Sequence, residues 1–268
     1  MTAFDESERR AWAAQADAYA GSFAKLCAYP VPRLLDAAGI EAGMRVLDVG
    51  TGTGTAAAAA GERGANVSAV DAEPSMTAVA VQNAPAASVH LAALPHLPFA
   101  DDEFDAVVGN FVLNHVGRPR AALEESRRVT RPGGRIAVTI WAVPAAAGQT
   151  LLGRAVQAAG VGRPAHLPAL DADDDFPRNE QGLAALLEEA GLKDVVCETL
   201  RWDHRATPDE WWSGPAAGVA TIGQTVRSQT PEVIETIKGH FGSLCAEFAD
   251  RDGVLVLPHA ALMGHGRA

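Results

Sequence analysis

The chain has 268 residues, with 22 basic and 33 acidic side chains and a formal net charge of −11. This acidic balance argues against a general nucleic-acid binder, which would present a basic face, and we expect no nucleic-acid partner. The length fits one large domain with or without an appendage. The scattered cysteines and the absence of a long apolar run predict a cytoplasmic protein with no metal site and no membrane partner.

The N-terminal segment carries an aromatic and apolar stripe. Its members recur at steps of three or four residues: Trp12, Ala16, Tyr19, Phe23 and Leu26. This spacing predicts one helix with these side chains on a single face. The stripe packs either on the core or across the mouth of a ligand site.

Residues 46–54 read VLDVGTGTG, and an Ala-rich segment follows them. An apolar run that ends in three spaced glycines predicts a buried parallel strand, a tight turn and the start of a helix. Glycines allow the backbone to bend sharply and to approach a ligand, and the N–H groups of the next helix face an anionic or polar group. The looser dinucleotide pattern is satisfied by Gly52, Gly54 and Ala57, so a nicotinamide-dependent dehydrogenase stays an alternative.

The acid inside this strand, Asp48, is not part of the dinucleotide pattern. With it, the nine-residue string resembles motif I of the class I S-adenosylmethionine (SAM) dependent methyltransferases. The resemblance implies SAM as cofactor and S-adenosylhomocysteine (SAH) as product. It also implies that Asp48 orders the loop and, directly or through water, the methionine end of SAM. Gly50, Thr51, Gly52 and Gly54 then form the turn that binds the cofactor.

A second acid, Asp71, ends the next predicted strand (residues 66–70) and lies 21 residues after Gly50 (71 − 50). At this spacing a carboxylate reaches the ribose of a bound nucleoside and accepts from both hydroxyls. The alternative is the N-cap of the helix that follows. In the family the residues just after this acid touch the adenine, which implies contacts from Ala72 and Met76.

The third predicted strand (residues 88–92) leads to a departure from the family. Many members carry an acid before a Leu-Pro-Phe segment, where it accepts from the adenine amino group. Leu-Pro-Phe is present here at 97–99, but Ala93 stands in place of the acid. The adenine edge would then be held by the backbone of Ala93 and Leu94, or not specifically.

The fourth predicted strand (residues 106–110) ends at Asn110, and Asn114 and His115 follow it. The carboxyl ends of parallel strands line the ligand crevice, so we expect Asn110 beside the cofactor and Asn114 beside the substrate. The imidazole of His115 suits proton transfer near neutral pH and is the candidate general base. The alternative is a histidine that bonds to backbone and only shapes the site.

Seven alternating strand and helix units predict an α/β fold with a doubly wound, mostly parallel seven-stranded sheet and helical cap insertions. We divide the chain into three parts. Residues 1–29 form a lid helix, and residues 30–141, 177–204 and 253–268 form the SAM-binding core. Residues 142–176 and 205–252 form a cap over the substrate site. The alternative for the cap is a peripheral buttress without substrate contact.

The resemblance also bears on the substrate side. The leading helix of the family often covers the cofactor mouth, which implies that Tyr19 and Phe23 are lid residues. Trp141, Trp211 and His204 would line an apolar or aromatic pocket, with core packing as the alternative for each tryptophan.

The Leu-Pro-Phe segment and the Asn-His pair are most similar to the quinone-biosynthesis-like and natural-product small-molecule group. We therefore expect a methyltransferase that moves a methyl group to O, N or C of a small molecule. Because SAM carries an activated methyl group, the protein must align a nucleophile, exclude water and accept any proton. The alternatives are a SAM-binding protein that does not transfer methyl, for example a cyclisation aid, and a methyltransferase of RNA or protein.

Overall fold

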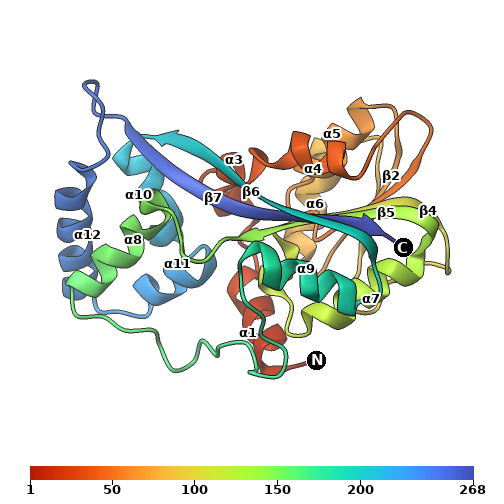
Figure 1. Ribbon diagram of the computed structural model, residues 1–268. Coiled ribbons are helices and arrows are strands. Elements are labelled where there is room, and N and C mark those ends of the chain that lie inside the picture. Colours follow the sequence, from red (N-terminus) through yellow and green to blue (C-terminus); the bar gives the residue numbers. More distant parts are fainter.

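The computed structural model describes residues 1–268, and seven strands form its single sheet, in the order β3-β2-β1-β4-β5-β7-β6 (Figure 1). The strands have these bounds: β1 Arg45–Val49, β2 Asn66–Asp71, β3 Ser88–Leu91, β4 Phe104–Asn110, β5 Thr130–Trp141, β6 Lys193–Ala206 and β7 Leu255–Arg267.

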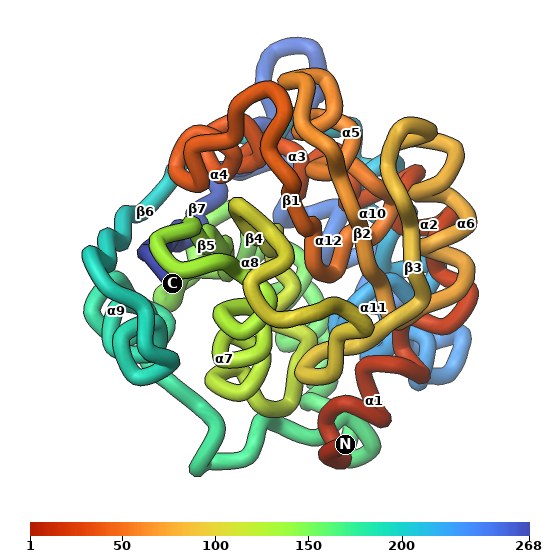
Figure 2. Tube along the Cα trace, turned by 90° about the vertical axis from the view of Figure 1, so that its right-hand side faces the viewer, coloured from red at the N-terminus to blue at the C-terminus, as the bar shows by residue number.

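Strands β1 to β5 pair in parallel, and only β7 runs antiparallel to its neighbours β5 and β6. This confirms the doubly wound, mostly parallel seven-stranded sheet. The strand order reverses between β1 and β4, which lie side by side in the view of Figure 2. In an open parallel sheet this switch point opens a crevice at the carboxyl ends of the strands, so the fold places a ligand site beside residues 50–54 and 111–115.

Helices cover both faces of the sheet and one end of it. Their bounds are α1 Ala3–Trp12, α2 Ala16–Ala20, α3 Ala24–Ala28, α4 Val31–Ala37, α5 Thr55–Glu62, α6 Pro74–Asn83, the 3₁₀ helix η1 Val112–His115, α7 Pro119–Val129, α8 Ala147–Ala158, α9 Glu180–Glu189, α10 Pro208–Ala217, α11 Ala220–Arg227 and α12 Pro231–Cys245. Side chains cap two of these helices: Asn179 accepts from the N–H of Gly182 at the start of α9, and Thr207 forms a capping box with Glu210 at the start of α10.

Strand β1 shows why the parallel strands read as unbroken apolar runs. Leu47 and Val49 belong to the core under α7 and α9, whereas Val46 belongs to the core under α4 and α5. Both faces of this strand are therefore covered by helices, as in other buried parallel sheets.

Strands β6 and β7 are the longest of the sheet, with 14 and 13 residues. Both reach past the sheet core, and α8, α10, α11 and α12 gather around their extended ends (Figure 1). A separate apolar cluster forms there, and Trp212, Ile237, Leu255 and Leu257 are among its buried members. Between residues 205 and 252 the cap thus holds three helices, α10, α11 and α12.

The prediction of a single N-terminal lid helix is wrong, because residues 1–29 form three short helices. Ala14 has a left-handed φ of 57°, which stops α1, and its N–H donates to Oε1 of Glu73 at 3.0 Å instead of to the preceding turn. Because two breaks divide the segment, the aromatic stripe does not lie on the face of one straight helix. Tyr19 lies on α2, and Phe23 caps α3.

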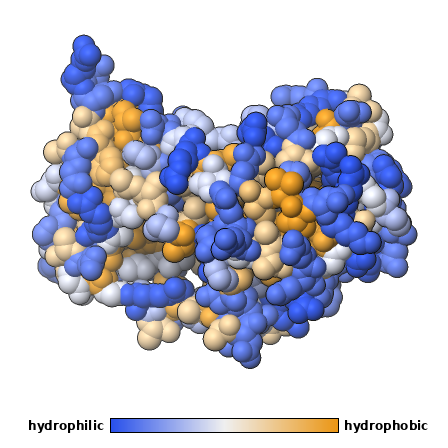
Figure 3. Space-filling model, viewed as in Figure 1, coloured by the Kyte–Doolittle hydropathy of each residue, from blue (hydrophilic) through white to orange (hydrophobic).

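No helix of the structure is both long and apolar enough to span a bilayer. The face drawn in Figure 3 is mostly hydrophilic, and apolar side chains form smaller patches on it. The outline of the molecule dips between the helical end, at the left, and the sheet core, at the right.

Candidate active site

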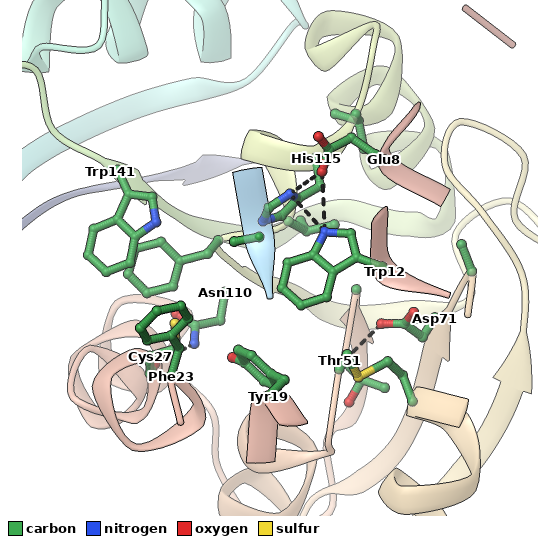
Figure 4. A pocket seen from close by; sticks show the side chains of 18 of the residues that line it. Glu8, Trp12, Tyr19, Phe23, Cys27, Thr51, Asp71, Asn110, His115 and Trp141 are labelled. Carbon is green, nitrogen blue, oxygen red and sulfur yellow. Dashed lines mark hydrogen bonds and ion pairs between the residues drawn. The ribbon is translucent and has the colours of Figure 1, made fainter. Parts of the chain in front are cut away.

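A cavity of about 650 Å³ opens at the switch point of the sheet, and 24 of its 42 lining residues are hydrophobic. In Figure 4, Thr51 and Asp71 lie on one side of this pocket, and Phe23 and Trp141 lie on the opposite side. The strand ends β1 and β2 build the first side, and the aromatic side chains build the second. We call these two sides the carboxylate half and the aromatic half.

The carboxylate half is organised by Asp48, whose residue is only 1% exposed. Its Oδ2 accepts from Oγ1 of Thr51 at 2.6 Å, and its Oδ1 is buried without a partner. Burial raises the pKa of this carboxyl to about 7. A buried carboxylate oxygen with no donor beside a cavity is a place where a cationic or N–H-bearing ligand group gains a strong hydrogen bond.

Asp48 makes the stability of the protein depend on pH. Because the pKa is raised from 3.8, the contribution of this group to stability is complete below about pH 4 and is lost as pH rises toward 7. Asp48→Asn keeps an oxygen that accepts from Thr51, so it should remove this loss. The difference in free energy of unfolding between the variant and wild type should therefore shift in favour of the variant by up to about 4 kcal/mol between about pH 4 and about pH 8. Urea unfolding without SAM at several pH values measures this, and parallel pH curves for the two proteins would contradict it.

Two glycines of the turn, Gly50 and Gly52, line the pocket, and both have positive φ. Gly52 has φ 55°, and a Cβ built on it would lie 3.9 Å from Cε1 of Tyr19. Gly54, which the sequence assigned to the cofactor, does not line the pocket. It is the N-cap of α5, where a Cβ would lie 3.0 Å from Cα of Ala80, so it allows α5 and α6 to pack closely.

Gly50 is the position where the turn tolerates no side chain. Its φ is 68°, and a Cβ would lie 2.3 Å from Cγ2 of Val112 on η1. We expect Gly50→Ala to lower the free energy of unfolding by about 3 kcal/mol, from strain and overpacking together. Gly43→Ala is the matched control, because Gly43 has φ 84° with open space around it, and it should cost only about 1 kcal/mol. Equal losses measured by urea unfolding would contradict the steric explanation.

Asp71 holds the turn of residues 50–54 as well as lining the pocket. It accepts from the N–H of Gly52 at 2.8 Å and from the N–H of Glu73 at 3.0 Å, and burial raises its pKa. The alternative role of Asp71, as the N-cap of the following helix, is wrong, because Glu73 caps α6 and accepts from the N–H of Ser75. Each carboxylate oxygen of Asp71 keeps a further acceptor site for a ligand.

The other predicted cofactor residues also line the pocket, namely Ala72, Met76, Ala93, Leu94 and Asn110. The side-chain amide of Asn110 is already engaged: Nδ2 donates to the carbonyl of Cys27 at 2.7 Å, and Oδ1 accepts from Oγ1 of Thr139 at 2.7 Å. This amide therefore ties the N-terminal segment to the sheet.

His115 lies on η1 between the two halves, and its partner is a carboxylate. Its Nδ1 is 2.7 Å from Oε2 of Glu8 on α1, so the alternative of a histidine bonded to backbone is wrong. The indole N–H of Trp12 lies 3.2 Å from the same oxygen (Figure 4). Because a carboxylate only accepts, Nδ1 carries the proton, and Nε2 keeps a free lone pair in the neutral ring.

Sequence reasoning missed Glu8 and named Trp12 only as a member of the aromatic stripe; α1 brings both to His115 over a separation of more than 100 residues. The helix is pinned beside His115, since Oδ1 of Asp5 accepts from the N–H of Gly117 at 2.6 Å. The spacing of Glu8 and Trp12 by four residues puts both on one helix face, but nothing in it indicates which partner they meet.

The pocket also contains four of the predicted substrate or lid residues, namely Tyr19, Phe23, Trp141 and Trp211, together with the unpredicted Phe111, Gln149 and His259. The Phe111 and Trp141 rings stack at 4.1 Å between centroids, and Phe23 meets Trp211 edge-on at 5.2 Å.

Two predicted substrate residues do not line the pocket, Asn114 and His204. Asn114 turns back within η1, and its Nδ2 donates to the carbonyl of Phe111 at 3.1 Å. His204 is buried behind Trp211, with the ring centroids 5.3 Å apart.

An open parallel sheet with a glycine turn after β1 and a carboxylate at the end of β2 is typical of a nucleoside-binding fold, and Asp48 within β1 is the feature that resembles motif I of the methyltransferases. The similarity of the chain to known proteins agrees with this class. Residues 47–138 match the family described as "Methyltransferase domain".

Demethylmenaquinone methyltransferase of Beutenbergia cavernae is 36% identical over 175 residues, which cover 62% of this chain and 72% of that protein. The enzyme of the same name from Renibacterium salmoninarum is 40% identical over 111 residues, covering 41% of this chain and 47% of that protein. The solved structure of YcgJ from Bacillus subtilis shares the fold, with a TM-score of 0.56 at 19% identity, over 90% of this chain and 99% of that one.

The chain belongs to the class I SAM-dependent methyltransferases. It is an enzyme whose cofactor is SAM, and the nicotinamide alternative is excluded by this membership.

Proposed function

We propose that this methyltransferase acts on a small, uncharged, largely apolar phenol, and that His115 accepts the proton of the phenolic hydroxyl. The observation that carries the proposal is the Glu8–His115 pair at the edge of the aromatic half. Flat apolar walls such as the stacked Phe111 and Trp141 favour a planar aromatic acceptor. The B. cavernae relative, a demethylmenaquinone methyltransferase, supports a small-molecule substrate.

On the carboxylate half, the residues present fit SAM. The unpartnered Oδ1 of Asp48 is available to the methionine end, Gly52 leaves room at the turn, and Asp71 has acceptor sites free for the ribose. Gly50 and Thr51 complete the turn. When bound, SAM supplies a methyl group already activated on a sulfonium. The chain must therefore orient the acceptor, exclude water and take up a proton.

The proton step follows from the tautomer of His115. Glu8 holds the proton on Nδ1, so Nε2 is free to take the hydroxyl proton of the acceptor, and the carboxylate stabilises the imidazolium that results. The side chain of His115 is 35% exposed, which gives the proton a route to solvent. The phenolate left behind is nucleophilic at oxygen and at the ring carbons beside it, so the methyl acceptor is O or C rather than N.

The N-terminal helices and the helical end act in this proposal as lid and cap. The pocket is lined from residues 1–29 by Tyr19 and Phe23, and from α8 and α11 by Gln149 and Ile222. These contacts support the division of the chain into lid, core and cap over the buttress alternative. A cytoplasmic location stays a prediction, supported by the three free cysteines.

Two measurements test the function. SAM or SAH at about 100 times its Kd should raise the melting temperature by about 5–10 °C, and NADH should leave it unchanged. Labelled SAM should then give methylated product from simple phenols, such as 2-naphthol, and none from the matched 2-methoxynaphthalene. Stabilisation by SAM with turnover of amines but not of phenols would overturn the acceptor class and leave the family intact.

A further inference from the structure

Two N–H groups converge on one carboxylate oxygen at the edge of the pocket. Nδ1 of His115 lies 2.7 Å and Nε1 of Trp12 lies 3.2 Å from Oε2 of Glu8 (Figure 4). The two nitrogens are 3.3 Å from each other. Because Nδ1 and the indole nitrogen both carry hydrogen, neither accepts from the other, and Oε2 is the acceptor for both.

The second donor fixes the orientation of the Glu8 side chain. This side chain is largely buried on α1, and its hydrogen bonds go to His115 and Trp12. Held by the imidazole alone, a glutamate keeps several rotamers, including those that turn its carboxylate toward solvent. With the indole N–H as a second donor, one orientation satisfies both groups. Trp12 thus restricts Glu8 to the orientation that pairs with His115.

Tryptophan is suited to this task by its chemistry. An indole N–H donates and never accepts, and it carries no charge. Glu8 therefore keeps its negative charge for the imidazolium that forms when His115 takes up a proton, whereas a lysine or arginine at position 12 would neutralise it. The indole ring also packs edge-on against the imidazole, with the centroids 5.1 Å apart and the planes at 87°. This contact limits rotation of the histidine ring.

The position of Trp12 is set by bonds other than its own. Helix α1 is tied down at one end, where the N–H of Gly117 donates to Oδ1 of Asp5 at 2.6 Å. Just past its other end, the N–H of Ala14 donates to Oε1 of Glu73 at 3.0 Å. Loss of the indole N–H should therefore leave α1 in place and affect only the carboxylate.

We propose that Trp12 is a positioning residue for methyl transfer. Its N–H holds Glu8 against Nδ1 of His115, which keeps Nε2 of the imidazole free to accept the proton of the acceptor. This inference rests on the proposed function, in which His115 is the base, and it adds a residue that itself exchanges no proton.

The first test is a substitution in the full chain that removes the donor and keeps an aromatic ring. Trp12→Phe should lower kcat for methyl transfer to 2-naphthol by about tenfold, with KM for naphthol within about twofold of wild type. In His115→Ala the same substitution should change the residual kcat by less than about twofold, because the indole acts only through the imidazole. Trp212→Phe is the matched control and should leave kcat unchanged, because Trp212 is buried away from the pocket.

The second test needs no methyl acceptor. Nitrogen NMR of the SAH-loaded protein with labelled histidine distinguishes the two neutral tautomers of His115. Wild type and Trp212→Phe should hold the Nδ1–H form, and Trp12→Phe should shift part of the population to the Nε2–H form.

Three results would overturn the role of Trp12. They are full kcat or an unmixed Nδ1–H form in Trp12→Phe, the same loss of kcat from this substitution in His115→Ala as in wild type, and an equal loss in Trp212→Phe. Failure of the proposed function would show separately, as no methyl transfer to phenols, and the tautomer of His115 would then decide the role of Trp12 by itself.

Discussion

Replacing His115 by alanine should lower kcat for methyl transfer to a phenol by about 10²–10⁴-fold, the range that general-base catalysis contributes. The Kd for SAH should stay within about twofold of wild type, because His115 lies between the two halves and makes no contact that holds the glycine turn. Turnover with labelled SAM and calorimetry with SAH give the two numbers. Undiminished turnover in the alanine variant would remove His115 from the mechanism.

Glu8→Gln extends this result to the residue that positions the imidazole. Glutamine keeps an oxygen near Nδ1 and loses the negative charge that stabilises the imidazolium, so kcat should fall by about tenfold or more while KM for the acceptor stays the same. Glu6→Gln, an exposed glutamate on the same helix, is the matched control and should leave kcat unchanged. If both variants lose activity equally, the effect belongs to the stability of α1 and not to the charge beside His115.

Replacing Asp71 by asparagine should weaken SAH binding by about 100-fold. The asparagine side chain would offer one acceptor oxygen where the carboxylate now accepts from Gly52 and Glu73, and its amide N–H groups would face backbone donors. Hydrogen bonds to charged groups contribute about 1.5–3 kcal/mol each, so the loss of one gives this order of magnitude. Calorimetric titration of the apo protein with SAH measures it.

The control for this prediction lies two residues away. Glu73→Gln keeps the Oε1 oxygen that accepts from Ala14 and Ser75, so the loop should hold its shape and SAH affinity should change by less than about threefold. Wild-type affinity in Asp71→Asn would show that the ribose is not bound at this carboxylate.

These variants also separate the two halves of the pocket. Asp71→Asn acts on the cofactor, and His115→Ala acts on the acceptor, and the two residues have no hydrogen bond in common. Helix α1 touches both sides, through Glu8 at His115 and through the bond from Ala14 to Glu73 that follows it. Loss of α1 should therefore impair cofactor binding and chemistry together.

The sequence by itself determined the central part of this protein. Strand β1, the turn at Gly50 and Gly52, and Asp71 at the end of β2 are set by local chemistry: apolar runs, positive φ at glycine and a fixed distance between strand ends. Those signals lie within a few residues of the groups they position. The parallel sheet and the SAM-binding class could be predicted for that reason.

Only the tertiary structure decided the rest. The packing of distant elements decides three details of the site. It decides whether His115 meets backbone or Glu8, and whether Gly54 faces the cofactor or α6. It also decides whether His204 lies in the pocket or behind Trp211. The break at Ala14, the long ends of β6 and β7, and the grouping of His259 with Trp211 depend on the same packing. A contact between residues far apart in the chain leaves no periodic trace in sequence, because each partner alone is compatible with many neighbours.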